Sequence, residues 1–226
     1  MPYDAEGEFY QATVMNYELG GNFNSHINLK LREEKAWTYG AGSYFNGSHY
    51  TGTFTAYAGV RTDASDSSVV EFMKAIKNYA NNGITQSELD YTKKAISQRE
   101  ALKYEDPYSK LFFLKNMVDY NLPNDYAAQQ NKILQSMTVA DVNALAKKWL
   151  DPDHMVISVT GDKSKIGDAL SKLGYQVVEV DAMGNPVVTT KPKTDDNKQT
   201  PPPASGNKEN TSKKKPKGAK YDNMPK

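Results

Sequence analysis

The fold of this chain is decided by one stretch near its N-terminus, residues 19–40, which reads LGGNFNSHINLKLREEKAWTYG. Two adjacent glycines, Gly20 and Gly21, are typical of a helix end, so they close a helix predicted over residues 8–19. We expect them to serve a tight turn between helices, because glycine adopts backbone conformations that other residues avoid. A second helix is predicted over about residues 23–33. After it, alternating side chains indicate that a strand begins.

Two strands are predicted next, and they read as a hairpin. Residues 37–45 and 53–60 both alternate in side-chain character, as expected of half-buried strands. Between them lies Asn46-Gly47-Ser48, which has the residue types of a tight turn. The sequence therefore predicts an antiparallel pair.

A block of helices follows the hairpin. Val69, Phe72, Met73, Ile76 and Ala80 share one helix face, and Asn81-Asn82-Gly83 ends that helix. Thr85 and Glu88 form a capping-box pattern that starts the next one. The helix that starts at Pro107 is predicted to turn Leu111, Leu114 and Val118 inward. The predicted helices cover residues 69–80, 85–104, 107 to before Pro123, 125–137 and 138–149.

Two more strands are predicted after this block. Met155, Ile157 and Val159 alternate in a third strand, a short helix covers residues 163–173, and a fourth strand covers 175–180. Strands on both sides of a helical run predict an α+β fold with a mixed, mainly antiparallel sheet and helices packed on one face.

The end of the chain differs in composition from the rest. Residues 187–226 hold ten lysines against four acidic residues, a charge of +6, whereas residues 1–186 carry −5. Few large apolar residues occur there, so we predict a disordered Lys/Pro-rich tail behind a domain of residues 1–186. An acidic body with a basic tail is not the profile of a nucleic-acid-binding domain.

Several kinds of functional site are excluded because the sequence lacks the residues that they need. The chain of 226 residues has no cysteine, which excludes disulfides, thiolate metal sites and cysteine nucleophiles. No apolar run reaches the length of a membrane span. The compartment stays open between bacterial periplasm and cytoplasm.

Three stretches together resemble one family. Residues 19–40 are similar to its "LGG-x-F-x-S-R-L … LRE-x-x-G-x-x-Y" segment, residues 83–89 to its "G-I-T-x-x-E-L" helix start, and residues 156–162 to its late "V-V-G-D" strand and turn. The family is the insulinase/pitrilysin-type zinc metallopeptidases with an inverted zinc motif. Two departures are Ala36 in place of a usual glycine and His26 in place of a usual arginine.

The resemblance is to the non-catalytic C-terminal domain of such enzymes. Their catalytic domain carries H-x-x-E-H, in which two histidines bind zinc and a glutamate acts as general base. This chain has only His26, His49 and His154, none with a second histidine at ligand spacing. His26 is interpreted as structural, and the other two as solvent or packing residues. The resemblance therefore implies a LuxS/MPP-like metallohydrolase fold, no metal or cofactor in this chain, and zinc in a partner domain.

In this family, the inactive domain contributes an arginine and a tyrosine to substrate binding. Arg32 and Tyr39 match that pair in motif and spacing. The resemblance implies that they hydrogen-bond the backbone of a peptide substrate near its scissile carbonyl. The arginine offers a fixed fork of donors, and the tyrosine hydroxyl donates to an oxygen that gains negative charge. The chain is then the substrate-binding half of a zinc metalloendopeptidase, with a fused or separate catalytic domain as partner.

Family domains of this type begin with a strand before the helix that residues 8–19 represent, and the resemblance implies that this strand is missing here. Its absence predicts an unpaired sheet edge or slot, and hence a chain of low stability or one that self-associates. Two alternatives stay open. The chain is a structural core or interaction subunit of the same fold without a peptidase role, or it is an unrelated module whose basic tail is the working part.

Overall fold

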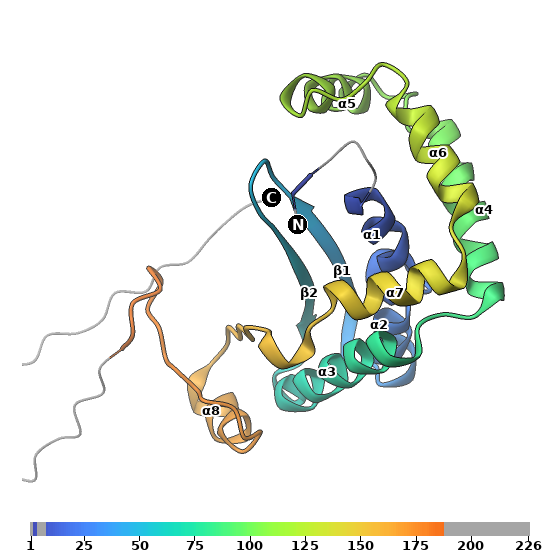
Figure 1. The fold of residues 1–226 in the computed structure, drawn as a ribbon. Coiled ribbons are helices and arrows are strands. Elements are labelled where there is room, and N and C mark those ends of the chain that lie inside the picture. The colour runs from blue at the N-terminus through green and yellow to red at the C-terminus, as the bar shows by residue number, and fades with distance from the viewer. Residues whose placement is uncertain (1, 4–7, 188–226) are drawn as a thin grey trace, which may run out of the picture. The chain divides into compact units, whose positions relative to one another are not determined.

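A computed structural model describes residues 2–3 and 8–187 of the chain. These residues fall into two units, with the division after Val177. The predicted tail lies outside the described residues except for Val187. All elements named below belong to the first unit (Figure 1). They are α1 Glu8–Asn16, η1 Tyr17–Gly21, α2 His26–Asn28, η2 Leu29–Glu34, β1 Thr38–Gly47, β2 Gly52–Val60, η3 Thr62–Ala64, α3 Ser65–Asn82, α4 Gln86–Leu102, α5 Pro107–Asp119, α6 Tyr126–Ser136, α7 Val139–Trp149, η4 Pro152–His154 and α8 Lys163–Ser171.

The α+β prediction is confirmed, with one antiparallel hairpin and helices against it. β1 and β2 pair as an antiparallel hairpin, as predicted, with Phe45 opposite Phe54 and Gly47 opposite Gly52. The turn was predicted at residues 46–48, but Asn46 and Gly47 belong to β1, so the turn lies at residues 48–51. The helices α1, α2 and α3 contact the hairpin, and α7 packs on α1 and α3 (Figure 1). Core side chains from these helices meet Ala41, Ala56 and Ala58 of the strands. Tyr44 and Tyr57 lie on the other face and are exposed.

The predicted helix boundaries agree with the structure where the sequence has capping residues. Thr85 and Glu88 form both hydrogen bonds of a capping box at the start of α4. Thr138 and Asp141 do the same for α7. Gly83 ends α3 with a φ of 64°, a conformation that glycine adopts without a steric penalty.

Two strand predictions are wrong among the described residues. Residues 155–160 are extended but belong to no sheet, and their backbone forms no hydrogen bond to other described backbone groups. Residues 175–179 are not a strand either, and only an isolated bridge joins Val180 to Pro186. Alternating side chains predict an extended chain, but a strand also needs a neighbouring backbone to pair with.

One side of the sheet is left open. Within the described residues, β2 has β1 as its only strand neighbour. A groove separates β2 from residues 155–161, and its floor is the apolar face of α3. Its lining includes Ala56, Ala58, Val69, Phe72, Met73, Met155, Ile157 and Val159. The opposite edge, along β1, is covered by α1 and α2.

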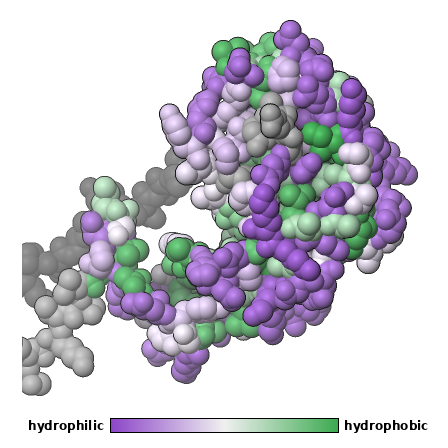
Figure 2. All heavy atoms as spheres, in the orientation of Figure 1, coloured by the Kyte–Doolittle hydropathy of each residue, from purple (hydrophilic) through white to green (hydrophobic). Residues whose placement is uncertain are grey.

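The orientation predicted for α5 is wrong. Leu111, Leu114 and Val118 are exposed rather than turned inward, and no residue of α5 is buried. Figure 1 shows α5 set apart from α3 and α7, and Figure 2 shows hydrophobic side chains at the surface in that region. Helical spacing identifies an apolar face correctly, but it does not say whether another element covers that face.

Candidate functional site

The segment that carries the sequence motif is built around two π-helical turns. The predicted helix over residues 8–19 continues without a break through η1 to Gly21, and the second predicted helix is α2 followed by η2. π-Helical turns are rare and often mark functional positions. Here the first holds Glu18 and the second holds Arg32.

Gly20 is needed for close packing rather than for a turn. It is not among the residues with positive φ. A Cβ atom built on Gly20 would lie 2.5 Å from the backbone nitrogen of Ser43 and 2.2 Å from its Oγ. Only a residue without a side chain lets η1 approach β1 this closely. The expectation of a tight helix-to-helix turn at Gly20 is therefore wrong.

Two buried asparagines tie the helices to the free edge of β1. The Nδ2 of Asn16 donates to the carbonyl of Ser43 at 2.7 Å, and the Ser43 hydroxyl donates back to Asn16 Oδ1 at 2.6 Å. The backbone N–H of Ala41 donates to Asn28 Oδ1 at 2.9 Å. These side chains satisfy strand groups that a neighbouring strand would otherwise bind, so this edge of the sheet is closed.

Tyr39 is turned outward by an irregularity at the start of β1. Thr38 pairs with Val60 and Ala41 with Ala58, so β1 has one extra residue at this point, a β-bulge. Strict alternation would place Tyr39 on the core face with Ala41. Instead it is 99% exposed, and its hydroxyl forms no hydrogen bond within the described residues.

Arg32 lies in the last turn of η2. Its guanidinium stands 4.4 Å from the centre of the Phe23 ring and donates to Glu33 at 2.5 Å. Exposed ion pairs of this kind contribute little stability, so Arg32 can exchange Glu33 for another acceptor at small cost. Ala36, between Arg32 and Tyr39, has a φ of 53°, the left-handed region that favours glycine.

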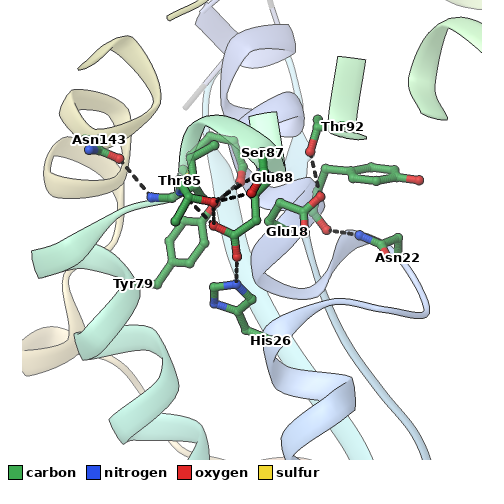
Figure 3. Close-up of polar contacts among 12 residues, drawn as sticks. Glu18, Asn22, His26, Tyr79, Thr85, Ser87, Glu88, Thr92 and Asn143 are labelled. Carbon is green, nitrogen blue, oxygen red and sulfur yellow. Dashed lines mark hydrogen bonds and ion pairs between the residues drawn. The ribbon is translucent and has the colours of Figure 1, made fainter. Parts of the chain in front are cut away.

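A second cluster joins η1, α2 and the start of α4, where the sequence predicted no site (Figure 3). Glu18, His26 and Glu88 each have one ligand-type atom in this cluster, and the three atoms lie within 4.8 Å of one another. His26 Nε2 lies 2.7 Å from Glu88 Oε1. The ring of His26 stands edge-on to Tyr79, whose hydroxyl donates to the Met15 carbonyl at 2.6 Å.

The pKa values of the two carboxyl groups in this cluster are shifted in opposite directions. Glu18 is only 5% exposed, and burial raises its pKa above the ordinary value. The pKa of Glu88 is lowered despite a desolvation effect in the other direction, because Glu88 accepts hydrogen bonds from Thr85 and His26. Glu88 could be identified in the sequence as part of a capping box, but its proximity to Glu18 depends on tertiary structure.

The remaining histidines do not join either cluster. His49 is exposed and its ring lies 4.7 Å from that of Tyr120. His154 is exposed and lies 2.7 Å from Asp151. No helix among the described residues is long and apolar enough to cross a membrane.

Comparison with known proteins finds a matching family model and two similar proteins. Residues 2–96 match the model of the peptidase M16 inactive domain. A Helicobacter pylori relative named "Non-peptidase homolog YmxG" is 25% identical over 72% of this chain and 38% of its own length. A Bacillus subtilis relative named "Uncharacterized zinc protease YmxG" is 23% identical over 67% of this chain and 37% of its own. The chain thus spans less than two-fifths of these relatives.

Solved structures agree with this placement. A peptidase M16 inactive domain from Pseudomonas fluorescens superposes with a TM-score of 0.60 at 28% identity, over 68% of this chain and 37% of that one. The inactive peptidase domain of a putative zinc protease from Bordetella parapertussis has a TM-score of 0.54 at 14% identity, over 66% of this chain and 81% of that one. These matches confirm the resemblance carried by residues 19–40: the chain is similar to the inactive domains of the insulinase/pitrilysin-type, or M16, peptidases.

Proposed function

We propose that this chain is the non-catalytic, substrate-binding half of a zinc metalloendopeptidase. It works with a catalytic domain that carries H-x-x-E-H and the zinc ion, either fused to it or as a separate chain. The match to an inactive M16 domain supports the non-catalytic part of this proposal. Arg32 and Tyr39 are the residues that contact the peptide.

The observation that carries the proposal is the exposure of Tyr39. An aromatic side chain that is 99% exposed buries no apolar surface and so adds little to the stability of the fold. The bulge that turns it outward is held in place, because the Thr38 hydroxyl lies 2.7 Å from the Gly59 carbonyl and 3.0 Å from the Gly40 N–H. β-Bulges often redirect a side chain next to a functional site.

The surface around Tyr39 suits the approach of a peptide backbone. Gly40 follows it directly, and Gly59 lies across the bulge on β2. A Cβ atom built on either glycine would meet nothing within 4 Å, so there is open space beside both. An extended substrate can approach it, and the Tyr39 hydroxyl can donate to a peptide carbonyl.

The test is peptide hydrolysis by the full chain combined with a catalytic M16 chain that carries H-x-x-E-H. Removing one donor to a developing oxyanion lowers kcat about 10²–10³-fold, so Tyr39→Phe is expected to reduce turnover by about that factor. Tyr50→Phe is the matched control, because Tyr50 is also exposed, at 90%, and lies in the hairpin turn. Equal rates for the two variants would contradict the role of Tyr39.

A parallel comparison addresses the arginine. Arg32→Ala is expected to raise KM for peptide, because it removes a fork of donors to backbone carbonyls. Arg61→Ala is its control, since Arg61 also pairs with a nearby acidic residue, Asp63, at the surface. If the two arginine variants behave alike, Arg32 does not bind substrate.

The name of the Helicobacter relative favours a second candidate, a structural or interaction subunit of the same fold without a peptidase role. In that case Arg32 and Tyr39 contact a partner protein instead of a substrate. The full chain would then bind its partner with an affinity that Tyr39→Ala weakens, and the pair would hydrolyse no peptide.

A further inference from the structure

The cluster of Glu18, His26 and Glu88 brings together three separate elements. Glu18 is in η1, His26 begins α2, and Glu88 is in the first turn of α4 (Figure 3). His26 and Glu88 are 62 residues apart in the chain, so no motif search based on local spacing can find them together. The Arg32 and Tyr39 pair does not share any residue with this cluster.

Each carboxylate accepts a hydrogen bond from a threonine outside the cluster. The Thr92 hydroxyl donates to Glu18 Oε1 at 2.7 Å. The Thr85 backbone N–H and hydroxyl donate to Glu88 Oε2 at 2.7 and 2.8 Å. Groups that bind metal ions are typically oriented by such outer hydrogen bonds, which fix the ligand before the ion arrives.

The charges of the cluster do not balance without a further cation. No lysine or arginine forms an ion pair with Glu18 or Glu88 among the described residues. Even a protonated His26 leaves two carboxylates with one positive charge. Burying an uncompensated carboxylate is costly, and Glu18 is almost fully buried. A proton on Glu18 removes the imbalance, and so does a bound metal ion.

His26 is the residue of this cluster best suited to a metal ion, because neutral histidine is among the commonest metal ligands.

We propose that Glu18, His26 and Glu88 bind a divalent metal ion, with Zn²⁺ as the best fit. Histidine nitrogen and carboxylate oxygen are both ordinary zinc ligands, at about 2.0–2.2 Å. Such bonds at tetrahedral angles place ligand atoms roughly 3.3–3.6 Å apart. That spacing lies between the 2.7 Å of the His26–Glu88 pair and the 4.8 Å limit of the cluster, so small side-chain movements complete the site.

This ion would stabilise the chain rather than catalyse a reaction of its own. It would join η1, α2 and α4, and α2 leads directly into η2, which carries Arg32. Because the imidazole must be neutral and the carboxyls ionised, binding would release protons and weaken as the pH falls. The proposal goes beyond the proposed function and does not depend on it.

The test is titration of the metal-stripped full chain with Zn²⁺, followed by calorimetry and by thermal unfolding, and repeated with Co²⁺ as a spectroscopic probe. We expect one ion per chain and a rise in Tm with Zn²⁺. Glu18→Gln and His26→Gln should each weaken binding at least 10-fold. His154→Gln is the control, since His154 also pairs with a carboxylate at 2.7 Å but lies at the surface.

Glu18→Gln distinguishes the two ways of balancing the charge of the cluster, a bound metal ion or a proton on Glu18. The variant keeps the side-chain shape, so without metal it should unfold at a higher Tm than the unaltered chain at neutral pH, and Zn²⁺ should no longer raise it. A stabilised Glu18→Gln together with an unaltered chain that binds no Zn²⁺ would show that a proton balances the charge. That result, or equal loss of binding in His154→Gln, would overturn the metal site.

Discussion

Substitution of Gly20 by alanine tests the close contact on which the whole motif segment rests. The new Cβ would lie 2.5 Å from the Ser43 nitrogen and 2.8 Å from its Cβ. Part of this conflict is with backbone, so a rotamer change cannot relieve it. Either β1 or η1 must move.

The cost can be worked out from what that movement disturbs. Overpacking in a core typically costs about 1–3 kcal/mol. Moving Ser43 also breaks its two buried hydrogen bonds with Asn16, each of which contributes about 0.5–1.5 kcal/mol. Gly20→Ala is therefore expected to lower the free energy of unfolding by about 2–6 kcal/mol. For a domain of this size, each kcal/mol corresponds to about 2–4 °C in Tm.

Urea unfolding of three variants measures this effect as a graded series. Gly40→Ala is the control in the same strand, because its Cβ would meet nothing within 4 Å, and its effect should stay within about 0.5 kcal/mol. Gly21→Ala should fall between, since its Cβ would lie 3.1 Å from the Asn16 carbonyl oxygen. If Gly20→Ala costs no more than Gly40→Ala, the close contact does not exist in solution and the reasoning is refuted.

Four further predictions concern stability and association. Ala36→Gly should stabilise the chain by about 0.5–1 kcal/mol in urea unfolding, because relief of the left-handed strain outweighs the added freedom of the unfolded chain. Tyr79→Phe should destabilise it by about 1–3 kcal/mol in the same assay, since the buried Met15 carbonyl loses its donor. Burial raises the pKa of Glu18 above its ordinary 4.5. The protonated carboxyl therefore contributes stability that is complete below pH 4.5 and is lost as the pH rises through the raised pKa. Glu18→Gln should remove this pH dependence from the free energy of unfolding. The open edge of β2 predicts concentration-dependent self-association in light scattering, which a charge introduced by Ile157→Lys in the facing groove wall should reduce; a stable monomer at all concentrations would contradict this.

Several features of the fold could be predicted because their causes are local. The hairpin follows from two alternating runs joined by residues of turn type, and the structure pairs these runs as antiparallel strands, although its turn lies at residues 48–51. The starts of α4 and α7 follow from capping boxes whose donors and acceptors lie within one turn. The similarity to peptidase M16 inactive domains was expected from residues 19–40, where the order of glycine, polar and apolar positions is specific.

Features that depend on distant partners could not be predicted. Residues 155–160 have the alternation of a strand but no neighbouring backbone, and Leu111, Leu114 and Val118 have the spacing of a buried face without a cover. Alternation and helical period describe one segment alone, whereas burial and pairing require a second segment in contact. The sequence cannot supply that second partner by itself.

The candidate sites divide in the same way. The sequence by itself identified Arg32 and Tyr39 through their motif, but only the tertiary structure shows the bulge opposite Gly59 that turns Tyr39 outward. The cluster of Glu18, His26 and Glu88 was decided entirely by tertiary structure, because its members come from three helical segments that no local period connects. Local patterns determine which residues form an element, and the packing of elements determines which of their side chains meet.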